Sequence, residues 1–282
     1  MRRIQPRWPA PTETPRPLAR GLLADLVSRG RLLLCLDYDG TLSEITPNID
    51  EAFPLERTRQ ALAALAASPE RVVVAIVSGR DIATVRRLLG LGDAIMFSGT
   101  HGLELAGLDG VVRTAQGVEE SFGDLRKLRD FLAREVPGRH GFVVEDKRLA
   151  IALHYRSAEP SEAEPLLARV ENFVAHKAPH LRVMKGKMVY EMLPRAAGGK
   201  DSAVRWFIAQ MGEARPQVAY FGDDTTDEEA FFALRPEGAA TVLVGPERPS
   251  FAHYRVDGPS AVADVLAELA EALTRLGSGR TR

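Results

Sequence analysis

Two aspartates separated by one residue follow the first strongly apolar run of the chain. The stretch reads "RLLLCLDYDGTL", where Asp37 and Asp39 precede a glycine and Thr41. Side chains two residues apart on an extended strand point the same way, so the two carboxylates should meet. They repel unless a cation or a proton lies between them, and Mg²⁺ takes hard oxygen ligands. The pair indicates a metal site or a divided acid and nucleophile role, with a solvated turn as the alternative.

Three further short motifs carry groups that suit an anionic ligand. "VSGR" places Ser78 after a second apolar run, and "GGKD" places Lys200 at the start of an expected helix. "GDDTTDE" places Asp223, Asp224 and Asp227 after a later run. Helix N-termini attract anions, and ligands bind at the carboxyl ends of parallel strands. Each motif alone also fits a tight turn, an exposed lysine or a helix cap.

Short apolar runs alternate with amphipathic segments along much of the chain. The runs are "RLLLCL", "RVVVAIV", "AIMF", "VAYFG" and "TVLVG". They are apolar throughout rather than alternating, which is typical of strands buried on both faces. We therefore expect an α/β fold, a parallel sheet with helices on both faces.

The middle of the chain has a different pattern. Residues 107–195 read as helix, hairpin, helix, hairpin, with turns expected at residues 145–148 and 185–187. This order indicates an α+β unit with an antiparallel sheet, inserted into the larger domain. We expect a core domain at 30–106 and 196–282, and an N-terminal extension at 1–29 that is partly disordered. The run "AAGG" after Pro194 suits a mobile crossing between the two domains.

The bulk properties exclude several classes of protein. The chain has 282 residues, a formal net charge of −1 and one cysteine. Nothing global attracts nucleic acid or a membrane surface, and no run approaches the ~20 apolar residues of a membrane span. Cys35 cannot form an intramolecular disulfide, and we expect it in the core. The Pro- and Arg-rich N-terminus is not a secretory signal, so we expect a cytoplasmic protein.

The four motifs, in their order, resemble those of the haloacid dehalogenase superfamily, whose phosphatases carry DxDGT where this chain has "DYDGT". The insertion lies between the second and third motifs, as in members with a C2-type cap. "LDYDGTL", "SGR", "HGLE", "ALHYR" and "GDDTTDE" further resemble the trehalose-6-phosphate phosphatase family, over roughly residues 30–275. The resemblance implies a Rossmann-like core, a cap that recognises the sugar, and hydrolysis of trehalose 6-phosphate with Mg²⁺.

The resemblance also implies a role for each motif residue. Asp37 would be the nucleophile that forms an aspartyl-phosphate, and Asp39 would protonate the leaving sugar oxygen and then activate water. Mg²⁺ would be held by Asp37, the backbone carbonyl of Asp39 and Asp223. Ser78 and Lys200 would hold the phosphoryl oxygens. Thr41 would donate to the same group, and Asp224 and Asp227 would orient the metal-bound water or Lys200.

Charged residues of the inserted unit would bind the sugar. By the resemblance, Glu145, Arg156, Lys187 and Glu191 match the positions that contact the disaccharide. Lys187 and Glu191 are four residues apart, so on a strand they face the same side. A charged hairpin on a solvated face is the alternative. The motifs "EDK", "HYR" and "GTHGLE" add Lys147, His154 and His101, of which His101 also fits a polar core residue.

Several other functions stay open at this level. Another capped sugar phosphatase, for sucrose phosphate or for hexose phosphates broadly, would share the core motifs. A non-catalytic regulator that senses a sugar phosphate, or a partner of a trehalose-phosphate synthase, is a further possibility. It is disfavoured because Asp37, Asp39, Lys200 and Asp223 are all present. A P-loop is excluded, since GxxxxGK[ST] is absent, and no GxGxxG follows a strand.

Overall fold

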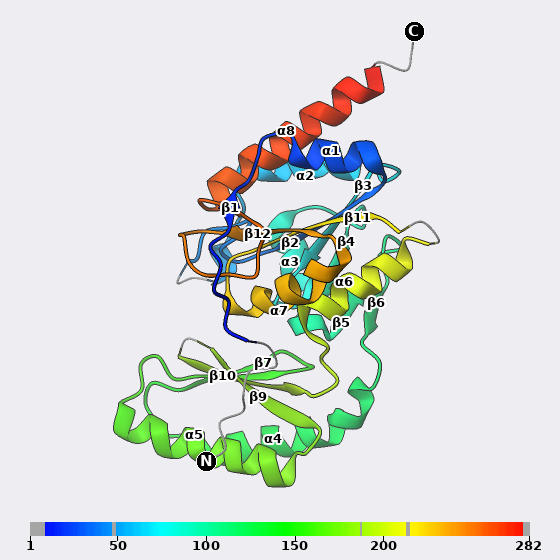
Figure 1. Ribbon diagram of the computed structural model, residues 1–282. Coiled ribbons are helices and arrows are strands. Elements are labelled where there is room, and N and C mark those ends of the chain that lie inside the picture. The colour runs from blue at the N-terminus through cyan, green and yellow to red at the C-terminus, as the bar shows by residue number, and fades with distance from the viewer. Residues whose placement is uncertain (1–8, 47–48, 187, 213–214, 279–282) are drawn as a thin grey trace.

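The computed structural model describes residues 9–46, 49–186, 188–212 and 215–278. Within these ranges the strands form two sheets, a larger mostly parallel one and a smaller antiparallel one (Figure 1). The larger sheet has the order β1-β13-β12-β11-β2-β3-β4-β5-β6. Its strands are β1 (Arg16–Pro17), β13 (Tyr254–Val256), β12 (Ala240–Val244), β11 (Gln217–Gly222), β2 (Leu32–Asp37), β3 (Val72–Val77), β4 (Met96–Gly99), β5 (Glu104–Ala106) and β6 (Val112–Thr114).

The apolar runs form the centre of this sheet. Every residue of β2, "LLLCLD", and of β3, "VVVAIV", is buried, and the two strands pair in parallel. A parallel strand covered on both faces needs apolar side chains on both faces, which explains the unbroken runs. Cys35 lies fully buried in β2, as expected. The predicted α/β fold with a parallel sheet is confirmed.

Helices cover both faces of the larger sheet. Leu34 of β2 packs in one core cluster with α1, α2, α3 and α8, whereas Cys35 packs in another with α6 and α7. Successive side chains of a strand point to opposite faces, so one strand serves both clusters. The helices are α1 (Leu22–Arg29), α2 (Glu56–Ala66), α3 (Ile82–Leu89), α6 (Gly199–Gln210), α7 (Thr225–Leu234) and α8 (Pro259–Ser278).

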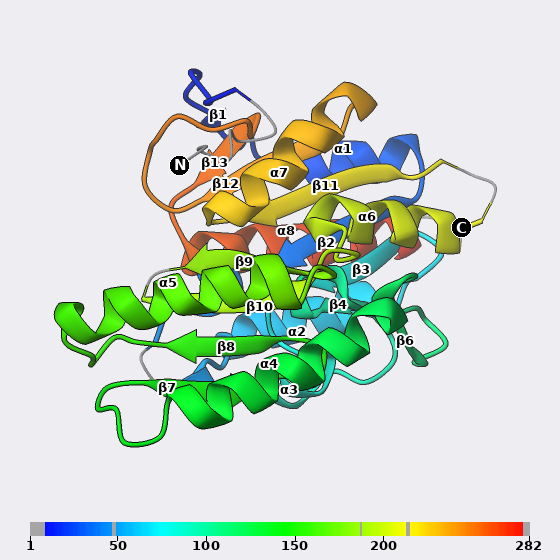
Figure 2. The same cartoon turned by 90° about the horizontal axis from the view of Figure 1, so that it is seen from below.

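The smaller sheet, with order β7-β8-β10-β9, is antiparallel throughout. We call it, together with α4 and α5, the antiparallel unit. Both helices pack on one face of its sheet, and the opposite face is turned toward the larger domain (Figures 1 and 2). The elements are α4 (Phe122–Glu135), β7 (Val143–Asp146), β8 (Ile151–His154), α5 (Pro160–Lys177), β9 (Leu181–Gly186) and β10 (Val189–Pro194).

The segment before residue 30 differs from the expected extension. In its described part, residues 9–29, β1 pairs with β13 at the sheet edge and α1 adds Leu23, Leu26 and Val27 to the core. Their spacing of three and one places them on one face of a helix, which covers the sheet. This part therefore belongs to the larger domain. Among the described residues, no helix is both long and apolar enough to cross a membrane.

Candidate active site

The motif residues gather at the carboxyl edge of the larger sheet. β2 ends at Asp37, Ser78 follows β3, and Asp223 follows β11; these three strands are neighbours. Lys200 is in the first turn of α6, which packs against β2 and β3. Parallel strands end at a common edge, so residues that are far apart in sequence come together here.

Lys200 joins two buried aspartates. Its Nζ donates to Oδ1 of Asp37 and to Oδ1 of Asp227, each at 2.7 Å. Burial alone would lower the pKa of the Lys200 ammonium, but the two carboxylates raise it above its ordinary value. Burial raises the pKa of Asp37, an effect that the charge of Lys200 opposes. The lysine therefore neutralises part of a largely buried negative cluster.

Both carboxylate oxygens of Asp227 already accept hydrogen bonds. Besides Lys200, it accepts from the hydroxyl of Tyr220 at 2.7 Å and, through Oδ2, from the backbone N–H of Asp224 at 3.1 Å. Asp224 caps α7 and is exposed; its side chain accepts from the backbone N–H of Thr225. Asp227 thus positions Lys200 and the start of α7. Tyr220 was not among the predicted site residues, although a tyrosine inside a buried apolar run needs a hydroxyl partner.

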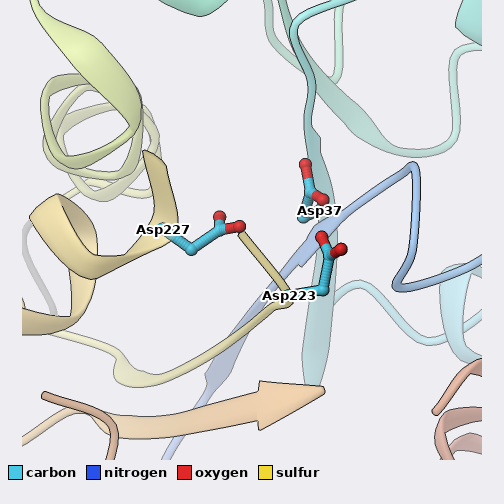
Figure 3. A group of neighbouring side chains, drawn as sticks. All are labelled: Asp37, Asp223 and Asp227. Carbon is cyan, nitrogen blue, oxygen red and sulfur yellow. The ribbon is translucent and has the colours of Figure 1, made fainter. Parts of the chain in front are cut away.

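Asp223 has the opposite character. Its Oδ1 is buried and has no hydrogen-bond partner among the described residues, and the same holds for the hydroxyl of Thr41. Burial and the charge of Asp227 raise the pKa of Asp223 to about 6. Its carboxylate lies beside that of Asp37, and Asp227 reaches toward both from α7 (Figure 3). One oxygen of each aspartate lies within 4.8 Å of the others.

This donor set fits a hard divalent cation. An unpartnered buried carboxylate oxygen costs free energy unless a ligand satisfies it. Asp223 supplies such an atom, and Asp37 supplies a second carboxylate next to it. Oxygen-only ligands with adjacent carboxylates are the chemistry that Mg²⁺ and similar ions prefer. Asp227 fits less well, because its oxygens already accept from three donors.

Asp39 is held by an arginine that the sequence analysis did not include. Nε and Nη2 of Arg80 donate to the two oxygens of Asp39, both at 2.7 Å. The backbone N–H of Arg80 also donates to Oγ of Ser78 at 3.1 Å. Arg80 therefore links the first two motifs. The motif "VSGR" contained the signal, since a charged residue in a turn at this edge lies within reach of the ligand site.

Several predicted sugar-binding residues meet on the open face of the antiparallel unit. Glu191 of β10 accepts from Lys147 at 2.9 Å and pairs with His101 at 2.8 Å. His101 belongs to the larger domain, in the short helix η2 (Thr100–Gly102), so this contact joins the two domains. Burial opposes ionisation of Glu191, but the hydrogen bond and charge of His101, with Lys147, lower its pKa to about 2. Glu145 forms a separate pair with His154 at 2.9 Å.

Two predicted sugar-binding residues lie outside these pairs. Arg156 is exposed in the turn after β8. Lys187 lies outside the residues that the structure describes. Among the described residues, Glu191 therefore contacts His101 and Lys147.

Comparisons with known proteins identify relatives of this chain. The family model described as trehalose-phosphatase matches residues 35–260. A trehalose-phosphate phosphatase of Mycobacterium ulcerans is 36% identical over 247 residues, which are 86% of this chain and 62% of that protein. The chain thus spans less than two thirds of that relative's length. It carries the motifs and the fold of one family of phosphatases.

Two solved structures are also similar. The Aspergillus fumigatus trehalose-6-phosphate phosphatase has a TM-score of 0.68 at 26% identity, covering 92% of this chain and 99% of that one. The C-terminal domain of the C. albicans trehalose-6-phosphate phosphatase has a TM-score of 0.75 at 24% identity, covering 92% of this chain and 98% of that one. The second likeness concerns the fold alone. Because the family model matches residues 35–260, which are most of this chain, the chain belongs to the trehalose-phosphatase family.

Proposed function

We propose that this chain hydrolyses trehalose 6-phosphate to trehalose and phosphate, with Mg²⁺ as cofactor and an aspartyl-phosphate on Asp37 as the intermediate. The observation that carries the proposal is the group of buried Asp37 and Lys200 with half-buried Asp223, in front of the polar face of the antiparallel unit. It combines a nucleophile, an unpartnered hard ligand and a cation at one edge. Hydrolysis of a phosphate monoester through an aspartyl-phosphate intermediate uses all three.

The environment of each residue in the site indicates its role in the reaction. When bound, a divalent cation held by Asp37, Asp223 and the backbone carbonyl of Asp39 supplies positive charge to the phosphoryl oxygens. Asp37 attacks phosphorus, and Lys200 offsets the negative charge that accumulates beside it. Ser78 and the unpartnered hydroxyl of Thr41 donate to the phosphoryl oxygens.

Asp39 acts as the general acid and then as the general base. It protonates the sugar oxygen as that oxygen leaves, and then takes a proton from the water that hydrolyses the aspartyl-phosphate. In the structure both of its oxygens accept from Arg80. Each oxygen keeps a second lone pair that can carry the proton, while protonation of Asp39 weakens its charge-assisted bonds with Arg80.

We also propose that the inserted unit, residues 107–195, is a cap that recognises the sugar. Glu145, Glu191, Lys147 and His154 provide charged donors and acceptors for hydroxyl groups on its open face. Arg156 and Lys187 remain candidates from the resemblance. A reaction that joins a phosphorylated sugar to a second sugar, a trehalose-phosphate synthase, must supply this substrate.

The test is phosphate release from trehalose, sucrose and glucose phosphates, with Mg²⁺ and with chelator, by the wild type and by Asp37→Asn. Fast release from trehalose 6-phosphate alone, lost with chelator and in the variant, supports the whole proposal. Similar rates on all three substrates would keep the core mechanism and refute the sugar assignment. Release that survives in Asp37→Asn would refute the intermediate. No release at all would favour a sugar-phosphate-sensing regulator, which calorimetry with trehalose 6-phosphate would then examine.

A further inference from the structure

The loop between β12 and β13, residues 245–253, reaches the predicted cation site through one arginine. Nη2 of Arg248 donates to the backbone carbonyl of Asp223 at 3.1 Å. Nη1 of the same guanidinium donates to Oε1 of Glu228, in the first turn of α7. Arg248 therefore connects three segments: its own loop, the turn that carries Asp223, and the helix that follows this turn.

Glu228 fixes the position of Arg248. Its side chain is buried, and its second oxygen accepts from Oγ of Ser250 at 3.1 Å and from the backbone N–H of Phe251 at 2.8 Å. A buried carboxylate is stable only when its oxygens are paired in this way. One oxygen of the carboxylate thus binds the guanidinium of Arg248, and the other binds the chain at Ser250 and Phe251. The guanidinium therefore has little freedom to turn.

The contact at Asp223 matters because of what its side chain lacks. Oδ1 of Asp223 has no hydrogen-bond partner among the described residues, so no donor orients that oxygen. The carboxylate packs against Gly40, where an added Cβ would lie 2.1 Å from Oδ2. Its direction therefore depends on this contact, on the neighbouring Asp37 and on the orientation of its own peptide unit. Arg248 holds the carbonyl of that peptide, and Asp227 accepts from its N–H.

We propose that Arg248 is a positioning residue for the cation site. It fixes the backbone of Asp223 so that the free carboxylate oxygen stays aimed at Asp37, and Glu228 locks Arg248 in place. The proposal rests on the proposed function, since it takes Asp223 as a ligand of the divalent cation. Residues that orient a metal ligand without touching the metal change metal affinity by about 10- to 100-fold when they are removed.

Arg255 provides a matched control. It anchors the other end of the same loop, since its Nη1 donates to the backbone carbonyl of Gly245 at 3.2 Å and to Asp257 at 2.6 Å. None of its hydrogen bonds among the described residues reaches Asp223. Loss of Arg255 loosens the loop, whereas loss of Arg248 loosens the loop and also removes one of the two hydrogen bonds that hold the peptide between Asp223 and Asp224.

The experiment measures binding of the metal alone to the full chain. Free Mn²⁺ is followed by electron paramagnetic resonance, and Mg²⁺ by competition, for the wild type, Arg248→Met, Arg248→Lys, Glu228→Gln and Arg255→Met. We expect the dissociation constant to rise about 10- to 100-fold in Arg248→Met, less in Arg248→Lys and Glu228→Gln, and less than about twofold in Arg255→Met. In steady-state assays, saturating Mg²⁺ should restore most of kcat in Arg248→Met, while KM for the sugar phosphate stays unchanged.

The outcomes separate this inference from the proposed function. A wild type that binds no divalent cation overturns the cation site, and the inference with it. A wild type that binds the cation, with Arg248→Met binding equally well, overturns the inference alone. Equal weakening in Arg248→Met and Arg255→Met assigns both arginines to loop stability and also overturns it. If Arg248→Met does not fold, Arg248→Lys and Glu228→Gln decide: wild-type affinity in both refutes the proposal.

Discussion

Replacing Lys200 by methionine should be among the most destabilising single changes in this chain. The side chains of Lys200 and Asp37 are 6% and 7% exposed, and that of Asp227 is fully buried, with both contacts at 2.7 Å. Without the ammonium, two carboxylates with oxygens within 4.8 Å of each other remain in a site closed to water. Methionine has a similar length and fills the space, so the change isolates the charge.

The magnitude follows from the distances. At an effective dielectric constant of about 20, a contact at 2.7 Å is worth roughly 6 kcal/mol and the residual repulsion at 4.8 Å costs roughly 3 kcal/mol. Most of this is offset, because the folded variant no longer desolvates an ammonium. Measured losses after removing one member of a buried ion pair are about 3–5 kcal/mol. We expect the free energy of unfolding to fall by that amount.

The assay is urea unfolding of the wild type, Lys200→Met and two comparison variants. Lys185→Met breaks an exposed pair with Glu171 and should cost no more than about 1 kcal/mol. Lys200→Met combined with Asp227→Asn removes one of the unpaired carboxylates and should recover part of the loss. A Lys200→Met protein as stable as Lys185→Met would refute the reasoning. So would a double variant no more stable than Lys200→Met alone.

Two further changes test the packing and the charge of the site. Gly40→Ala should abolish phosphate release and cost more stability than Gly21→Ala: both glycines have a φ of +77°, but a Cβ at Gly40 would lie 2.1 Å from Asp223 and one at Gly21 meets nothing within 4 Å. Equal effects in urea unfolding and phosphate release would contradict this. Burial opposes ionisation of Glu191, but its partners, above all His101, hold its pKa near 2. The ionised side chain therefore stabilises the fold at pH values above its ordinary pKa of 4.5, and this stabilisation is lost as the pH falls toward 2. The stability advantage of wild type over Glu191→Gln, at most ~3 kcal/mol, should therefore shrink in urea titrations from pH 5 to pH 3, and a constant difference would refute it.

Periodicity alone predicted much of what the structure shows. The apolar runs around Cys35 and Ala75 lie on central strands with both faces covered. Because parallel strands share one edge, the strand ends also predicted that Asp37, Ser78 and Asp223 lie close together, whereas the place of Lys200 beside them came from the resemblance. These inferences need only the direction of each strand. They do not need the rotamer of any side chain.

What periodicity could not predict depends on side-chain geometry. Asp223 and Asp227 are two acidic residues of one motif, yet one keeps a free oxygen and the other accepts from three donors. The difference arises because α7 starts between them, so Asp227 turns back to close a capping box while Asp223 stays at the strand end. Similarly, the pairing of Arg80 with Asp39 joins two loops whose relative position only the folded sheet defines.

The antiparallel unit shows the same limit in another form. The turn expected at residues 145–148 lies later, since β7 continues to Asp146 and β8 begins at Ile151. This difference matters because shifting a strand by one residue moves every side chain to the other face. The observed register aligns Glu145 with Ala152, and Ala152 with Glu191, so both glutamates share the face opposite the helices.

If the antiparallel unit binds the sugar as proposed, recognition depends on this register as much as on residue type. On the shared face each glutamate already has a partner: His154 for Glu145, and Lys147 with His101 for Glu191. A hydroxyl group that enters must join or replace these bonds, so a ligand with hydroxyls at the wrong spacing leaves the buried charge of Glu191 unpaired. Selectivity is then set by the cost of broken pairs. A sugar whose hydroxyl groups match the spacing of the two glutamates loses the least free energy from broken pairs.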